Sequence, residues 1–176
     1  MIELILARHA KSDWGDTSIT DHARPLNARG RRDAPLMAER LARSGASVDL
    51  LLSSTAVRAR TTAAHFGEEL GVEITEDRDL YLASGDALFM RAAAPGAASV
   101  MVVAHDPGLS ELAWRLSDGG ITHMPTCAVA RFVWEPMSGA RAGDADPWDA
   151  AALRPADRWS FDSPRGGALH HRSVSR

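Results

Sequence analysis

Three short apolar segments constrain what this chain can fold into, because each is bounded by polar or turn-forming residues and is too short for a buried helix. They are residues 2–7, 48–52 and 99–104. Runs of this length are typical of strands buried on both faces of a parallel sheet. Segments of helical character separate them, at about residues 28–44, 55–70 and 86–94. Strands alternating with helices predict an α/β protein, a three-layer α/β/α sandwich with a mostly parallel central sheet.

Helix boundaries are marked by residues with known positional preferences. Ser53 or Ser54 is predicted to cap the helix over 55–70, and Gly71 to close it. Pro35 falls inside the first predicted helix, so that helix either begins near Asp33 or is kinked at the proline.

The second half of the chain adds weaker signals. Asp106 followed by Pro107 predicts the start of a fourth helix, with the proline in its first turn. Two further strands are predicted to pair with each other, at residues 128–134 and 158–161. The segment 135–155 is rich in Gly, Pro, Ala and Asp, which predicts a surface loop with a short helix near 148–153.

Length and composition indicate an ordinary globular protein. The 176 residues fit one domain over 1–163, and the segment 164–176 has little to bury and is expected to be a flexible tail. A net charge of −3 provides no broad attraction to nucleic acid or to a membrane. Cys127 is the single cysteine, so no internal disulfide and no cysteine-rich metal site are expected, and a cytoplasmic location fits. Composition does not define the oligomeric state.

Chemically capable side chains follow each of the three apolar segments. Arg8 and His9 end the first, Arg58 lies just after the second, and His105 follows the third. Because the carboxyl ends of parallel strands share one edge of a sheet, we expect these four residues to converge there. Helices that begin near the same edge aim backbone N–H groups and their positive dipole ends toward it, which favours an anion.

This set of residue types suits the transfer of a phosphoryl group. Most of the catalysis of such a transfer is charge neutralisation by fixed donors, which Arg8 and Arg58 provide. A neutral imidazole attacks phosphorus directly, and we assign that role to His9, with its other ring nitrogen donating to a backbone carbonyl. We expect His105, held among phosphate oxygens, to be protonated and to act as a charged donor.

At these residues the chain resembles the histidine phosphatase superfamily, which has the phosphoglycerate mutase-like fold. Its closest likeness is to the SixA-type phosphohistidine phosphatases, with Ala10 in the usual glycine position of the Arg-His-Gly signature. The segments that carry the resemblance are Arg8-His9-Ala10-Lys11-Ser12, Arg24-Pro25-Leu26-Asn27-Ala28-Arg29-Gly30, Ser53-Ser54 to Arg58-Ala59-Arg60-Thr61, and Ala104-His105-Asp106-Pro107-Gly108.

The resemblance implies a role for each matched residue. His9 is the expected phospho-acceptor, Arg8, Arg58 and His105 are expected to hold the phosphoryl group, and Ser12 to add a hydrogen bond. Larger family members supply a proton-donating carboxylate from the segment that corresponds to residues 76–81. The candidate here is Asp79, and the competing carboxylates are Asp77, Asp86 and Asp106.

We therefore expect a phosphatase that uses no metal or other cofactor and hydrolyses phosphohistidine on protein substrates through phosphorylated His9. Mutases of the family carry a sizeable insertion that covers the pocket, whereas only 18 residues separate Tyr81 from Val100 here, so the resemblance implies a shallow, open site that suits a bulky substrate. The alternatives are a broad-specificity phosphomonoesterase for small molecules and a phosphate-binding module without turnover. The expected partner is a phosphorylated protein or a small phosphorylated substrate, with no nucleic acid and no membrane. Trp14 either lines the pocket rim or packs its loop onto the domain.

Overall fold

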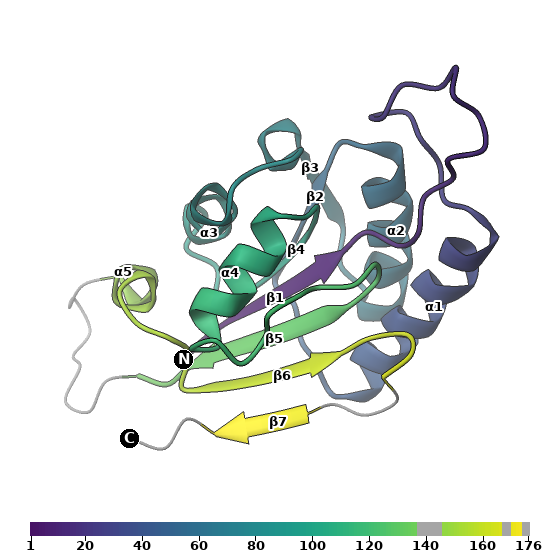
Figure 1. Ribbon diagram of the computed structural model, residues 1–176. Helices are drawn as coiled ribbons and strands as arrows, with labels where there is room; N and C mark the ends of the chain where they lie inside the picture. Colours follow the sequence, from purple (N-terminus) through teal and green to yellow (C-terminus); the bar gives the residue numbers. More distant parts are fainter. Residues whose placement is uncertain (137–145, 167–169, 174–176) are drawn as a thin grey trace.

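The computed structural model describes residues 1–136, 146–166 and 170–173, and they form one seven-stranded sheet (Figure 1). Its spatial order is β3-β2-β4-β1-β5-β6-β7. The strands are β1 (Ile2–Arg8), β2 (Leu50–Ser54), β3 (Ile74–Asp77), β4 (Ser99–Ala104), β5 (Val129–Trp134), β6 (Arg158–Asp162) and β7 (His170–Ser173). The first four in spatial order are parallel, and β5, β6 and β7 each pair antiparallel to their neighbour. The predicted mostly parallel sheet is confirmed.

Helices cover both faces of this sheet, so the three-layer prediction is also confirmed (Figure 1). Two lie on one face, α1 (Ala28–Arg43) and α2 (Val57–Leu70), and three on the other, α3 (Gly85–Ala93), α4 (Gly108–Leu116) and α5 (Pro147–Ala152). A single 3-10 turn, η1 (Arg78–Leu80), follows β3. In the part of the chain that the structure describes, no helix has the length and hydropathy needed to span a membrane.

Strand β1 shows why its sequence is apolar at nearly every position. Leu4 and Leu6 pack into the core beneath α3 and α4, whereas Ile5 and Ala7 belong to the core beneath α1 and α2. All four side chains are fully buried. Burying a side chain the size of leucine stabilises the fold by about 1.5–3 kcal/mol, so the central strand is a rigid base for the residues at its end.

Two elements, β3 and α1, differ from expectation. Strand β3 was not predicted, because its sequence, Ile-Thr-Glu-Asp, has no apolar alternation and its pairing with β2 comes from tertiary context. Helix α1 begins at Ala28 and continues through Pro35, so of the two alternatives left open the start near Asp33 is wrong. Asn27 fixes this start, because its side chain accepts a hydrogen bond from the backbone N–H of Gly30.

The predicted serine cap of α2 is wrong. The residue before this helix is Ala56, which makes no side-chain capping bond, and the hydroxyl of Ser54 is instead bonded to His105. Gly71 closes the helix with φ +66°, as predicted. Helix α4 begins one residue later than expected, with Pro107 as its cap, while the Asp106 carboxylate accepts the N–H of Ser110.

The tail prediction for 164–176 needs one correction. Residues 170–173 form β7, which pairs with β6, because the open edge of β6 offers backbone groups that any extended segment can pair with. The short helix expected near 148–153 is present as α5. The middle of the predicted 135–155 loop, residues 137–145, lies outside the described residues.

Candidate active site

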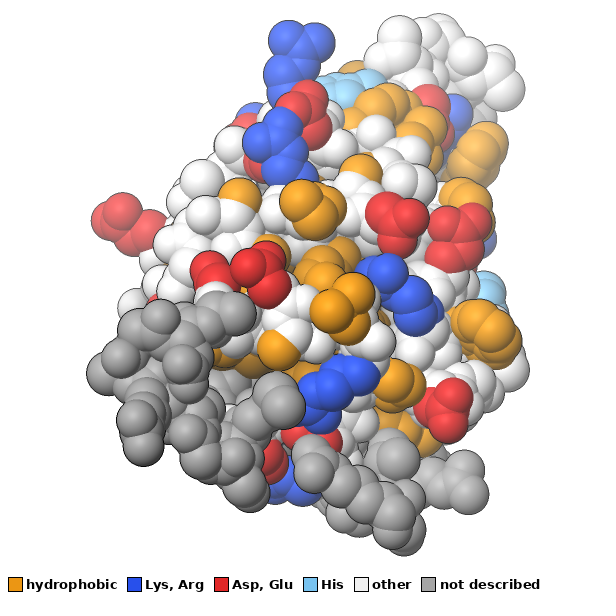
Figure 2. All heavy atoms as spheres, turned by 90° about the vertical axis from the view of Figure 1, so that its left-hand side faces the viewer, with side chains coloured by type: hydrophobic (Ala, Val, Ile, Leu, Met, Phe, Trp, Pro, Cys, Tyr) orange, Lys and Arg blue, Asp and Glu red, His pale blue; other side chains and the backbone are white. Residues whose placement is uncertain are grey.

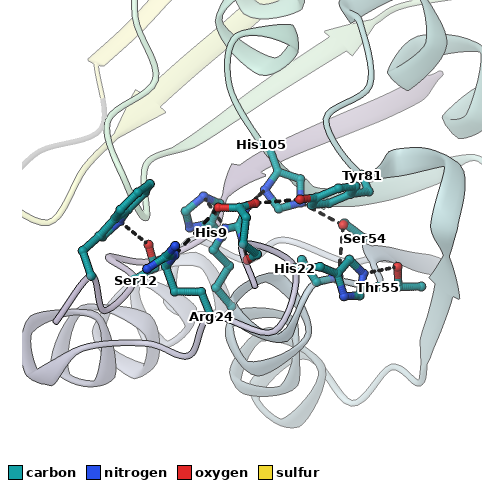
Figure 3. Close-up of polar contacts among 12 residues, drawn as sticks. His9, Ser12, His22, Arg24, Ser54, Thr55, Tyr81 and His105 are labelled. Atoms are coloured by element: carbon teal, nitrogen blue, oxygen red, sulfur yellow. Dashed lines mark hydrogen bonds and ion pairs between the residues drawn. The ribbon is translucent and has the colours of Figure 1, made fainter. Parts of the chain in front are cut away.

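The carboxyl ends of β1, β2 and β4 lie at the same edge of the sheet. Arg8 is in register with Ala104, and the backbone N–H of His9 donates to the carbonyl of Ala104 at 3.1 Å. Arg58 enters from the first turn of α2, and His105 directly follows β4. The structure thus brings the four predicted residues into one cluster, with the imidazoles of His9 and His105 5.1 Å apart (Figure 3).

His9 is oriented as a nucleophile requires. Its Nδ1 lies 2.8 Å from the carbonyl oxygen of Ala10, so this nitrogen carries the proton and donates it, as predicted. The Nε2 lone pair then faces the site, where Nε of Arg58 donates to it at 3.3 Å. Burial lowers the pKa of His9 to about 4, and the charges of Arg58 and Arg8 act in the same direction. The imidazole is therefore neutral and nucleophilic at pH 7.

Arg58 connects the two histidines of the cluster with Asp21. Besides Nε toward His9, its Nη2 contacts Nδ1 of His105 at 3.3 Å and donates to the carboxylate of Asp21 at 2.9 Å. Its Nη1 donates to the backbone carbonyl of Asp21. The side chain is almost fully buried, so this guanidinium is a preorganised donor set for phosphoryl oxygens.

His105 is held by Arg58 and Ser54. Burial lowers its pKa to about 3, with His9 and Arg58 adding to the effect, so these protein groups by themselves favour the neutral imidazole. Because Nη2 of Arg58 can only donate, Nδ1 of His105 accepts, and its Nε2–H donates to the hydroxyl of Ser54 at 2.8 Å. The expected protonation of His105 depends on the negative charge of a bound phosphoryl group and stays a prediction.

Arg8 is held at the other side of the cluster. Its Nη1 donates to the carbonyl of Met124 at 2.8 Å and forms an ion pair with Asp106 at the same distance. Its Nε is buried and has no hydrogen-bond partner among the described residues. A buried donor without a partner is costly unless a ligand satisfies it, which fits a phosphoryl oxygen at this position.

Thr62 is a positioning residue that the sequence analysis missed. It lies one turn after Arg58 on α2, and its buried hydroxyl donates to the Arg58 carbonyl at 2.7 Å. The same hydroxyl accepts the backbone N–H of Ala10 at 3.0 Å. One side chain therefore ties the backbone after His9 to the helix that carries Arg58.

The structure does not bring the predicted acid, Asp79, into the cluster. Its side chain is 56% exposed and pairs with Arg91 on α3. The face of the molecule on the side of α3 carries interspersed acidic, basic and hydrophobic side chains (Figure 2). Two of the competing carboxylates are also engaged elsewhere, Asp77 with Arg91 and Asp86 with Arg115.

A different carboxylate, Asp21, reaches the site from the loop between β1 and α1. Its Oδ2 accepts from Nη2 of Arg58 and from the hydroxyl of Tyr81 at 2.6 Å. Tyr81 stands edge-on to His105, with ring centroids 5.4 Å apart (Figure 3). The sequence analysis missed both residues, and the only available signal was the position of Asp21 three residues before the quoted Arg24-Pro25-Leu26 segment.

The remaining site prediction, Ser12, lies in the same loop as Trp14. Its buried hydroxyl accepts from the indole N–H of Trp14 at 3.1 Å, so its role as a phosphate ligand stays a prediction. The guanidinium of Arg24 stacks on the Trp14 ring at 3.9 Å, although the indole remains 64% exposed. Trp14 thus packs against its own loop and also presents surface to solvent. Within the described residues, no group of three His, Cys, Asp or Glu side chains is placed to hold a metal ion.

A mostly parallel α/β sandwich with two histidines and two arginines gathered at one edge of its sheet has a donor set suited to a phosphoryl group. Residues 4–81 match the model of the histidine phosphatase superfamily (branch 1). The chain belongs to this superfamily.

Known proteins similar to this chain include both mycobacterial relatives and solved SixA structures. It is 36% identical to the uncharacterized protein Rv1276c of Mycobacterium tuberculosis (strain ATCC 25618 / H37Rv), over 92% of this chain and 95% of the relative. A putative phosphohistidine phosphatase SixA from Agrobacterium tumefaciens is 29% identical, with a TM-score of 0.67 over 74% of this chain and 89% of that one. A protein histidine phosphatase SixA complexed with tungstate has the same TM-score at 21% identity, over 93% of this chain and 97% of that one, and shows the fold alone.

Proposed function

We propose that this protein is a phosphohistidine phosphatase that acts on phosphorylated proteins through a covalent intermediate on His9. In the first step Nε2 of His9 attacks phosphorus, and the leaving imidazole of the substrate departs. Arg8 and Arg58 hold the phosphoryl oxygens in both steps, because their donors are fixed before substrate arrives. His105 joins them once the phosphoryl charge favours its protonated form. Water then hydrolyses the phosphorylated enzyme.

The observation that carries the proposal is the state of the carboxylate at the site. The hydrogen bond from Tyr81, together with Arg58, holds the pKa of Asp21 below its ordinary value. An ionised carboxylate has no proton to give to an alkoxide leaving group, so ordinary phosphoesters receive no acid assistance from it. The imidazole of a phosphohistidine can leave already protonated, which suits this site.

Two other functions are less well supported. A broad-specificity phosphomonoesterase needs a proton donor, and the predicted one, Asp79, is paired with Arg91 at the surface. A binding module without turnover has no need for a neutral, oriented imidazole beside two guanidinium groups. The arrangement of His9 favours an enzyme for that reason.

A substrate panel tests the proposal. We expect kcat/KM for a protein carrying phosphohistidine to exceed that for phosphoserine, sugar phosphates and nucleotides by at least ~10²-fold. A general acid usually contributes a factor of this size to the rate, and the esters would react without one. A strong preference for one metabolite ester would contradict it. We also expect EDTA to leave the activity unchanged, and a loss that added metal restores would contradict the metal-independent mechanism.

A further inference from the structure

Asp21, Arg58 and His9 form a continuous chain of contacts from solvent to the nucleophile. The Asp21 carboxylate lies 2.9 Å from Nη2 of Arg58, whose Nε lies 3.3 Å from Nε2 of His9. The Asp21 side chain is 42% exposed, whereas His9 is 8% exposed. Asp21 is therefore the solvent-exposed end of this chain of contacts, and His9 is its buried end.

Tyr81 fixes the direction of this carboxylate. Its hydroxyl donates to the same oxygen that Arg58 contacts, and it comes from the segment after η1, in a different part of the chain. His22 packs edge-on against the other side of the Tyr81 ring at 5.0 Å, and its Nε2 contacts the hydroxyl of Thr55. The loop carboxylate is thus held by Arg58 and by Tyr81, two side chains from other parts of the chain.

We propose that Asp21 is the general base that activates water for hydrolysis of phosphorylated His9, and that Tyr81 is the residue that positions its carboxylate. This inference rests on the proposed function, since it concerns the second step of that reaction. It places the catalytic carboxylate in the loop after β1 and makes it a base, whereas Asp79 was expected to be a proton donor.

The step balances without any further reactant. The oxygen of a water molecule forms a bond to phosphorus while Asp21 takes one of its protons. The N–P bond breaks, and its electron pair returns to Nε2 of His9. The proton on Asp21 then passes to the departing phosphate or to solvent, which restores the carboxylate for the next turnover.

The charges around Asp21 agree with a base rather than an acid. The Tyr81 hydrogen bond lowers the pKa of Asp21, and the same bond raises the pKa of Tyr81. At pH 7 the carboxylate is ionised and the phenol keeps its proton. The titratable and charged groups that face this carboxylate or its two partners are Arg8, His9, His22, Arg24, Arg58, Tyr81 and His105.

Asp21 could instead be only an ion-pair partner that orients Arg58. Rapid-quench kinetics distinguish this role from that of a general base, because they measure phosphorylation and dephosphorylation of His9 separately. With radiolabelled phosphoramidate as the probe, Asp21→Asn should still phosphorylate His9 within a few-fold of the wild-type rate. Its dephosphorylation should slow by ~10²–10³-fold, so that the phosphoenzyme accumulates. If Asp21 only oriented Arg58, both steps would slow together, because Arg58 serves both, and that result would overturn the proposal.

Two further variants keep the test decisive. Asp16→Asn is a matched control, since Asp16 lies in the same loop and its carboxylate, among the described residues, accepts hydrogen bonds from Ser18 and not from Arg58 or Tyr81. It should leave both rates unchanged. Tyr81→Phe should slow dephosphorylation by ~10-fold and move the acidic limb of its pH profile to higher pH, because the bond that lowers the pKa of Asp21 is lost. An unmoved limb would overturn the role of Tyr81, and this measurement decides the matter if Asp21→Asn does not fold.

The two proposals fail in different ways. If wild-type protein forms no phosphohistidine on His9, the proposed function and this inference both fall. If it forms the intermediate and Asp21→Asn hydrolyses it at the wild-type rate, only this inference falls. Added formate should restore dephosphorylation in Asp21→Ala and should have no effect on the rate of Asp16→Ala. That result would support Asp21 as the general base.

Discussion

The site has two halves that are built differently. The first, here called the strand-end half, consists of Arg8, His9, Ser54 and His105, whose backbones belong to or directly follow buried strands. The second, here called the loop half, consists of Trp14, Asp21 and Arg24 in the connection between β1 and α1. Sheet hydrogen bonds on both sides hold the first half, whereas the side chains of Arg58 and Tyr81 hold Asp21 of the second.

This difference separates the chemistry from the access to it. The imidazoles of the strand-end half are almost fully buried and neutral, which keeps the nucleophile ready. The loop half is in contact with solvent and with any substrate that approaches. Because surface loops open more readily than buried strands, we expect the loop half to adjust to a substrate more readily than the strand-end half.

The largest effect is expected from the strand-end half. His9→Ala should lower phosphatase activity by at least ~10⁴-fold, because it removes the atom that attacks phosphorus. Thermal unfolding should still show a folded protein. His65→Ala, on α2, is the control and should retain full activity. Undiminished turnover by His9→Ala would refute the covalent mechanism.

Removing the link between the halves should have the next largest effect. Arg58→Ala should reduce kcat/KM by ~10²–10³-fold, the usual effect of losing one charged donor to the transition state. The matched control is Arg60→Ala, which removes an exposed arginine of the same helix that pairs with Glu76. Equal activity of the two variants would mean that the cluster is not where phosphate binds.

The pH dependence of stability should report the strand-end half. The pKa values of His9 and His105 are lowered to about 4 and about 3, so the unfolded chain binds more protons than the folded one between about pH 6.5 and 4. The free energy of unfolding should therefore fall as pH falls through this window, by up to ~3 kcal/mol for each histidine. Urea unfolding at several pH values measures this. His105→Gln should make the free energy of unfolding less dependent on pH. If this free energy does not change with pH in the wild type, the pKa values of the two histidines are not lowered by folding.

The smallest effect is expected from the outermost part of the loop half. Trp14→Ala should raise KM for a phosphorylated protein by a few-fold and leave kcat unchanged, because the exposed indole is stacked on Arg24 and makes no contact with His9 or Arg58. Steady-state kinetics on phosphoramidate provide the control, since so small a substrate does not reach the indole. A large fall in kcat would show that the two halves are coupled more closely than their contacts indicate.

The predictability of each part follows from how local its cause is. Strands β1, β2 and β4 were predicted because burial on both faces requires a run of apolar residues, and the convergence of Arg8, His9, Arg58 and His105 followed from parallel topology. Strands β3 and β7 were not predicted, since each forms only by pairing with the exposed edge of another strand, β2 and β6 respectively. Ser54 was expected to cap α2 but bonds to His105, because a hydroxyl takes whichever partner the tertiary fold brings near it.

The choice of carboxylate shows the same limit at the site. In the sequence, Asp79 and Asp21 are both aspartates with no local feature that makes one of them catalytic. The family resemblance pointed to the segment 76–81 and therefore to Asp79. In the structure Tyr81, two residues after Asp79, faces the site and holds Asp21, while Asp79 turns outward to Arg91. The direction of one side chain relative to the next depends on the 3-10 turn between them, which local sequence does not define.

By itself the sequence determined the layered fold, the sheet edge that carries the chemistry and the four residues that converge there, because apolar periodicity and parallel connections restrict these to one arrangement. Only the tertiary structure decided the lowered pKa of His105, the hydroxyl that holds it and the carboxylate that joins Arg58. These depend on burial and on contacts between groups far apart in the chain, and the order of residues in the sequence does not show which of these groups lie within a few ångströms of each other.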